Sequence, residues 1–224
     1  QAGKRVIAGG PGNPPVVVDD TADLDLAARS IIAGAAYDNN LLCIGEKEVF
    51  VLASVADAFV AAMRKAGAFQ LDARAIAKLT EAAFEFEGPG KGCGRAHVKR
   101  ELLGQDASVL AEAAGVQVPP GTALLFGETD ARHPFVEEEQ MMPFLPIVRV
   151  KCIDAAIEGA RRAEHGYRHT AVIHTRNVEH ATRMARALNT TLFVQNAPST
   201  AALGVAVPGY FSHTIATPTG EGIT

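Results

Sequence analysis

The fold is decided by the stretch PPVVVDDTADLDLAARSIIAGA, residues 14–35. Three consecutive valines at residues 16–18 form an apolar, β-branched run that is typical of a strand, and Asp19-Asp20 predicts a turn after it. Residues 21–24 resemble a helix start with acidic side chains in the first turn. Apolar and small residues then recur at helical spacing as far as Gly34. The stretch therefore predicts a strand followed by a helix.

The same alternation continues along the chain. Further strands are predicted at residues 48–52, 123–126, 147–150, 170–174 and 191–194, and further helices at residues 55–66, 72–83, 107–114, 152–164 and 178–188. Residues 87–95 hold four glycines and a proline, which predicts a loop. Strands alternating with helices predict one α/β domain in three layers, with a mostly parallel sheet flanked by helices.

Composition excludes several classes of function. The chain has 224 residues, of which 48% are apolar, which is enough for a sizeable hydrophobic core. Its formal charge of −4 does not favour nucleic acid or a membrane surface as a partner. No apolar run approaches the roughly 20 residues that span a bilayer. Three widely spaced cysteines indicate a reducing compartment. Because no initiator Met opens the chain, we interpret it as a piece of a longer protein.

Cys43 is the first candidate for a catalytic side chain. It lies in NNLLCIGEK, residues 39–47, between a predicted helix and a predicted strand, where a loop can present a side chain toward a cleft. A reactive thiolate needs an exposed or electropositive setting, which backbone N–H groups, Asn amides and Lys47 could supply. The alternative from these residues alone is an inert cysteine buried between Leu42 and Ile44.

The segment DNNLLCIGEK, residues 38–47, resembles the nucleophile motif of the aldehyde dehydrogenase superfamily. It is most similar to that of the CoA-acylating acetaldehyde and propionaldehyde dehydrogenases associated with bacterial microcompartments. Four more blocks occur in family order: GNPP (residues 12–15), EQMMPFLP (139–146), HTAVIH (169–174) and TIATPTGEG (214–222). Residues 84–105 fit the family least. The resemblance implies that residues 1–224 are the catalytic domain, without the Rossmann-like cofactor-binding half and the C-terminal tail.

The resemblance implies NAD-dependent oxidation of a short aldehyde, propanal or acetaldehyde, to an acyl-CoA. Cys43 would attack the aldehyde to give a thiohemiacetal, whose carbon passes a hydride to the nicotinamide. The acyl group would then remain on Cys43 as a thioester that coenzyme A cleaves. His169 matches a proposed acid/base group, and a histidine suits the deprotonation of a thiol near neutral pH. A histidine packed at a strand start explains His169 equally well.

Further contacts follow from the same resemblance. Glu139 matches a glutamate that contacts the nicotinamide ribose, although the acidic run at residues 137–139 is also typical of a solvated surface. Two small residues join it as expected cofactor contacts, Gly9 and Pro143. The substrate and coenzyme A channel is expected to involve Asn40, Ile44, Asn196 and Pro198. His165 and His169 form no HExxH pattern, so no metal site is expected.

The acyl acceptor is predicted from a missing carboxylate. Hydrolytic relatives use a glutamate base about 34 residues before the nucleophile, a spacing that reaches Gly9 here. Residues 1–18 contain neither Asp nor Glu, which favours a thiol acceptor over water. Two alternatives stay open: a hydrolytic or phosphorylating enzyme of the same fold, and a non-catalytic assembly module. The resemblance further implies a homo-oligomer in the cytoplasm, with packaging inside a bacterial microcompartment shell as an option.

Overall fold

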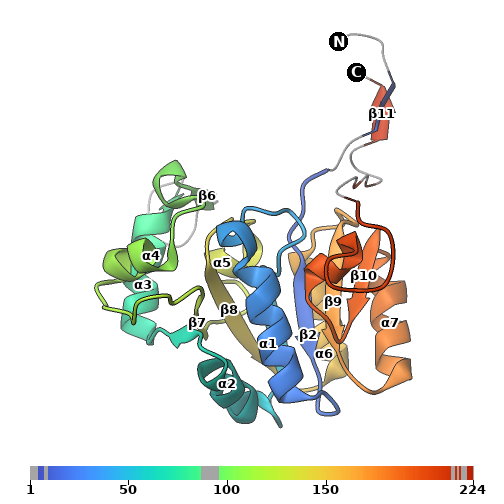
Figure 1. Ribbon diagram of the computed structural model, residues 1–224, viewed down its shortest axis with the longest axis horizontal. Coiled ribbons are helices and arrows are strands. Elements are labelled where there is room, and N and C mark those ends of the chain that lie inside the picture. The colour runs from blue at the N-terminus through green and yellow to red at the C-terminus, as the bar shows by residue number, and fades with distance from the viewer. Residues whose placement is uncertain are drawn as a thin grey trace.

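The computed structural model describes residues 5–7, 10–86, 96–212, 215, 217 and 221–223. A seven-stranded sheet lies at its centre, with helices on both faces, as Figure 1 shows. All neighbouring strands of this sheet are parallel, in the order β10-β9-β2-β3-β8-β7-β4. Their bounds are β2 (Pro15–Val18), β3 (Glu48–Leu52), β4 (Phe69–Gln70), β7 (Leu125–Glu128), β8 (Phe144–Val150), β9 (Thr170–His174) and β10 (Leu192–Gln195). The predicted three-layer α/β architecture is confirmed.

Seven α-helices connect or cover these strands in the described part of the chain. They are α1 (Leu24–Ala35), α2 (Ala56–Lys65), α3 (Ala73–Ala83), α4 (Ala107–Ala114), α5 (Pro134–Glu137), α6 (Ile153–Ala163) and α7 (Val178–Leu188). Short 3-10 turns are η1 (Tyr37–Asn40), η2 (Arg100–Leu102) and η3 (Ser199–Leu203). None of the helices among the described residues has the length and apolar content to cross a membrane.

The alternation of side chains along the central strands divides the core. Val16 and Val18 pack with α1 and α2 on one face, while Val17 packs with α6 and α7 on the other. A third cluster joins α3 and α4 to the β7 and β8 end of the sheet. All three valines are fully buried, and each such burial stabilises the fold by about 1.5–3 kcal/mol. A run of β-branched residues therefore forms a central strand that is covered on both faces.

Capping side chains fix several helix starts. Asp23 accepts a hydrogen bond from the Leu26 backbone N–H, and Asp72 accepts one from the Ala75 N–H. Asn177 accepts bonds from two backbone N–H groups in the first turn of α7. Because these short polar side chains satisfy N–H groups that have no partner within the helix, the predicted starts are close to the observed ones.

The remaining differences from the predicted elements have local causes. The strand predicted at residues 123–126 is found at Leu125–Glu128, and the strand predicted at residues 147–150 begins earlier, at Phe144. Pro146 is tolerated inside β8 because β8 pairs with β3 only from Ile147 onward, where N–H groups are available. Two short antiparallel pairs were not predicted, β5 (Phe84–Phe86) with β6 (Ala96–Val98) and β1 (Arg5–Ile7) with β11 (Glu221–Ile223). The loop predicted at residues 87–95 lies outside the described residues.

Candidate functional site

Four of the sequence blocks meet at one edge of the sheet. The GNPP block precedes β2, the Cys43 segment precedes β3, the Glu139 segment precedes β8 and His169 precedes β9. These four strands are immediate neighbours in the order β9-β2-β3-β8, and all run in the same direction. Residues that lie far apart in the sequence are therefore collected at the amino ends of the four central strands.

Three consecutive residues in the left-handed conformation form the turn that leads into the Cys43 loop. Asp38, Asn39 and Asn40 have φ values of 50°, 50° and 64°, which are costly for most side chains but are tolerated best by Asn and Asp. The Asn39 amide donates to the Gly104 carbonyl at 3.0 Å and to Asp106 Oδ1 at 2.8 Å. These contacts hold the segment between α1 and β3 against the residues that follow η2.

The buried Asn40 amide ties the two ends of this loop together. Its Nδ2 donates to the Ala35 carbonyl at 2.8 Å and to the Glu46 carbonyl at 3.0 Å. Its backbone and side-chain oxygens accept from Lys47 Nζ at 2.7 and 2.5 Å, and a weaker contact of 3.5 Å joins Nζ to the Leu42 carbonyl. Lys47 itself is fully buried. These hydrogen bonds therefore fix the position of the loop that holds Cys43.

Cys43 is partly exposed, in contrast to its neighbour Ile44, which is fully buried. Partial burial and the Glu139 carboxylate raise the pKa of the Cys43 thiol, while its own backbone N–H and Lys47 lower that pKa. Cys43 is therefore not sealed in the core between Leu42 and Ile44. Near neutral pH the sulfur is mostly a thiol, so its chemistry needs a local proton acceptor or positive charge.

His169 lies against the Cys43 backbone across Gly12. A Cβ atom added to Gly12 would lie 2.9 Å from His169 Cγ and 3.1 Å from the Cys43 carbonyl oxygen, so only glycine fits between them. His169 Nδ1 is 2.8 Å from Thr170 Oγ1, and its Nε2 is buried without a hydrogen-bond partner among the described residues. Burial, and then Lys47, lower the pKa of His169. The ring is therefore neutral at pH 7 and can accept a proton.

Glu139 is the third side chain at this edge. It is partly exposed, and its carboxylate accepts a hydrogen bond from the Gly12 N–H. Burial raises the pKa of Glu139, while Lys47 and the Gly12 N–H lower it. The next residue, Gln140, is fully buried and donates to the Lys47 carbonyl at 3.1 Å. The segment before β8 is thus held against the Cys43 loop.

The other residues predicted to contact the cofactor, the substrate or coenzyme A lie in different parts of the structure. Pro143 is buried, and its carbonyl accepts from the Leu125 N–H at 2.9 Å. Asn196 lies at the carboxyl end of β10, where its amide exchanges hydrogen bonds of 2.8 and 2.9 Å with the Thr175 backbone. Pro198 precedes η3. Gly9 lies outside the described residues. The structure therefore brings Cys43, His169 and Glu139 together but directs the Asn196 amide elsewhere.

Two buried carboxylates near the site were missed from the sequence. Glu46 accepts bonds from the Ser199 N–H at 2.8 Å and the Ser199 hydroxyl at 2.7 Å, and burial raises the pKa of Glu46 to about 7. Glu48 has two buried oxygens without hydrogen-bond partners among the described residues, and burial raises its pKa well above the ordinary 4.5. The charged residues in GEKE, residues 45–48, were the available signal, but charged side chains are rarely fully buried.

Within the described residues, no group of three or more His, Cys, Asp or Glu side chains has a geometry that could hold a metal ion. The chemistry that the site offers is instead a thiol beside a neutral imidazole, a carboxylate and a buried ammonium. A thiol can form a covalent acyl intermediate, and a neutral imidazole can take a proton from an incoming acceptor.

Comparison with known proteins gives a consistent result. Residues 1–72 match the aldehyde dehydrogenase family. The chain is 46% identical over 222 residues to the acetylating acetaldehyde dehydrogenase EutE of Salmonella typhimurium, covering 99% of this chain and 47% of that protein. It is 44% identical over 225 residues to the CoA-propanoylating propanal dehydrogenase of Citrobacter freundii, covering 100% of this chain and 47% of that protein.

A solved structure shares the fold closely. The propionaldehyde dehydrogenase of Rhodopseudomonas palustris, with bound CoA and an acylated cysteine, has a TM-score of 0.87 and 40% identity. The match covers 97% of this chain and 48% of that one. The chain therefore spans about half the length of the curated relatives and of the solved structure that it matches.

Proposed function

This chain belongs to the aldehyde dehydrogenase family, and from that premise we propose that it is the catalytic part of an enzyme that oxidises a short aldehyde to an acyl-CoA through a thioester on Cys43. The observation that supports this proposal best is the convergence of a partly exposed Cys43 with His169 and Glu139 at the amino ends of four adjacent strands.

The proposed reaction begins at the Cys43 sulfur. The thiolate attacks the aldehyde carbon to give a thiohemiacetal, whose oxyanion is stabilised by the Cys43 backbone N–H. Loss of a hydride from that carbon leaves an acyl thioester on Cys43. A nicotinamide cofactor, when bound, supplies the hydride acceptor. The substrates proposed for the whole protein are acetaldehyde and propanal, which are also the substrates in the names of two relatives.

Coenzyme A is the proposed acyl acceptor. Its thiol loses a proton as it attacks the thioester carbonyl, and the bond from that carbon to the Cys43 sulfur then breaks, which frees the Cys43 thiolate and releases acyl-CoA. The neutral ring of His169, which lies beside the Cys43 backbone, is proposed to accept the proton. The buried Nε2, which has no partner among the described residues, is the atom proposed to take it. The missing carboxylate in residues 1–18 supports the same acceptor, since no general base for water attack lies there.

Glu139 is the residue of this chain proposed to contact the nicotinamide cofactor. The Gly12 N–H holds its carboxylate, which is partly exposed and interacts electrostatically with Cys43. A carboxylate in this position fits the hydrogen-bond donors of a ribose. The roles of Pro143, Gly9, Asn40, Ile44, Asn196 and Pro198 stay predictions, as do the homo-oligomer, the cytoplasmic location and packaging in a microcompartment.

The test is the coupled reaction of the full-length protein. NADH formation from propanal or acetaldehyde should require coenzyme A, should yield acyl-CoA, and should vanish in Cys43→Ala. The 224-residue chain alone should be alkylated at Cys43 yet fail to reduce NAD. An acid or acyl phosphate as product would favour the hydrolytic or phosphorylating alternative. Indifference of the full-length protein to both NAD and coenzyme A, with an unreactive Cys43, would favour the assembly module.

A further inference from the structure

Lys47 is among the largest fully buried side chains in the described part of the molecule. Burying an ammonium is costly unless other groups compensate for the water that it loses. The three oxygens that its Nζ contacts, two on Asn40 and one on Leu42, are all neutral. Hydrogen bonding is therefore supplied by the Cys43 loop, and the positive charge remains available to groups at the site.

The contacts of Lys47 lie on the residues that set the position of Cys43. Asn40 is the last of three consecutive residues with positive φ, a conformation that persists only when its surroundings fix it. The Leu42 carbonyl belongs to the peptide unit that supplies the Cys43 N–H. A cation that binds this carbonyl polarises the peptide and strengthens its N–H as a donor.

The charge of Lys47 also faces the other ionisable groups of the site. Glu139, from the segment before β8, and Glu46 and Glu48, from its own segment, interact with it electrostatically, as does Cys43. His169, from the start of β9, feels the same charge. Burial lowers the pKa of Lys47 to about 8, so the ammonium is still mostly protonated at pH 7. Lys47 is thus a positive centre shared by all the groups that the proposed reaction uses.

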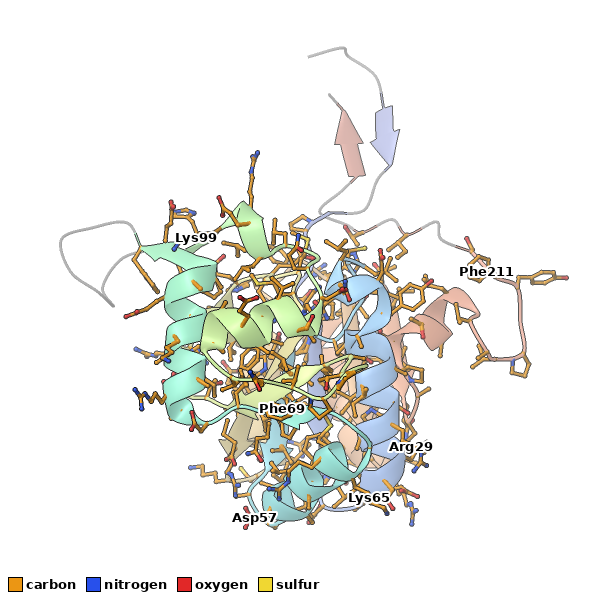
Figure 2. All side chains as sticks on the ribbon, turned by 60° about the vertical axis from the view of Figure 1, so that its left-hand side comes forward. Arg29, Asp57, Lys65, Phe69, Lys99 and Phe211 are labelled. Atoms are coloured by element: carbon orange, nitrogen blue, oxygen red, sulfur yellow. The ribbon has the colours of Figure 1, made fainter. Side chains whose placement is uncertain are left out.

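We propose that Lys47 is a positioning residue for the nucleophile: its buried ammonium fixes the loop at residues 40–42 and places a positive charge beside Cys43, where negative charge develops. This inference rests on the proposed function, because it takes Cys43 as the nucleophile. Figure 2 shows Lys65, in contrast, at the outer surface of α2, where its Nζ is 2.8 Å from Asp25.

The test is the rate of Cys43 alkylation by iodoacetamide as a function of pH, measured by mass spectrometry of the Cys43 peptide in the full-length protein. Lys47→Met removes both charge and hydrogen bonds, Lys47→Gln keeps an N–H donor, and Lys65→Met is the matched surface control. Both Lys47 variants should be alkylated roughly 3- to 10-fold more slowly at pH 7, and this deficit should shrink above about pH 8, where the wild-type Lys47 loses its own charge. Lys65→Met should follow the wild type.

Two results would overturn the proposal. One is a folded Lys47→Met protein that is alkylated at the wild-type rate at pH 7. The other is a uniform fall in rate at every pH, which would show a purely structural role. If Lys47→Met does not fold, Lys47→Gln decides by the same criterion. Alkylation needs no aldehyde, nicotinamide or coenzyme A, so a failure of the proposed aldehyde oxidation would show in its own assay and could not be mistaken for a failure here.

Discussion

Substitution of Gly34 by Ala should destabilise the protein although it improves the intrinsic propensity of α1. Gly34 is buried in the last turn of this helix. An added Cβ would overlap both carboxylate oxygens of Glu46 and lie 2.5 Å from its Cδ. Glu46 cannot move without breaking its bonds from the Ser199 N–H and hydroxyl. The higher helix propensity of Ala and the overlap with Glu46 therefore change the free energy of unfolding in opposite directions.

The magnitudes favour destabilisation. Replacing Gly by Ala inside a helix is worth about 1 kcal/mol in favour of folding. Overpacking of a buried site costs about 1–3 kcal/mol. Loss of the two Ser199 hydrogen bonds costs about 1 kcal/mol each. The sum predicts that Gly34→Ala lowers the free energy of unfolding by about 2–4 kcal/mol.

Equilibrium urea denaturation of a double-mutant cycle measures this effect. In a Glu46→Ala background the overlapping carboxylate is gone, so the same Gly34→Ala substitution should now stabilise by about 1 kcal/mol. The reversal of sign is the signature of the contact. A stabilising Gly34→Ala in the wild type, or an equal cost in both backgrounds, would refute the reasoning.

The remaining predictions concern pH and catalysis. Burial raises the pKa of Glu46 from 4.5 to about 7, so between these pH values the carboxyl group is ionised only in the unfolded state. The free energy of unfolding of the wild type should therefore fall by roughly 3 kcal/mol, relative to that of Glu46→Gln, as the pH rises from 4.5 to about 7. Burial lowers the pKa of His174 from 6.5 to about 4, so between these pH values only the unfolded state binds the proton. The free energy of unfolding of the wild type should therefore fall by roughly 3 kcal/mol, relative to that of His174→Leu, as the pH falls from 6.5 to about 4. Urea titrations at several pH values check both, and flat differences would contradict them. His169→Asn should slow acyl transfer to coenzyme A about 10²- to 10⁴-fold while Cys43 remains open to alkylation; an unchanged transfer rate would remove His169 from its proposed role.

The strongly patterned elements of this fold could be predicted from the sequence. The helices at residues 107–114 and 178–188 and the strand at residues 170–174 were predicted with the bounds that the structure has. The two helices have apolar residues at helical spacing, the strand is a short apolar run buried at every position, and each element has a polar residue or a glycine at its boundary. The two-residue β4, the four-residue α5 and the β5–β6 pair are too short to show a period, so they depend on tertiary contacts.

The residues of the candidate site could be named from the sequence, but their arrangement in space could not. Cys43, His169 and Glu139 came from a resemblance, whereas their convergence depends on the order β9-β2-β3-β8, which no local pattern specifies. The burial of Lys47 could not be predicted either, since a lysine between two glutamates is typical of a solvated loop. Its contacts depend on the left-handed turn at Asn40, which becomes visible only in three dimensions.

The most direct measurement is the search for an acyl group on Cys43. The full-length protein, incubated with propionyl-CoA and digested under mildly acidic conditions, should carry a propionyl group on the Cys43 peptide. Added coenzyme A should remove it, and Cys43→Ala should show none. Acylation at Cys93 or Cys152 instead, or sustained CoA-dependent oxidation by Cys43→Ala, would contradict the account.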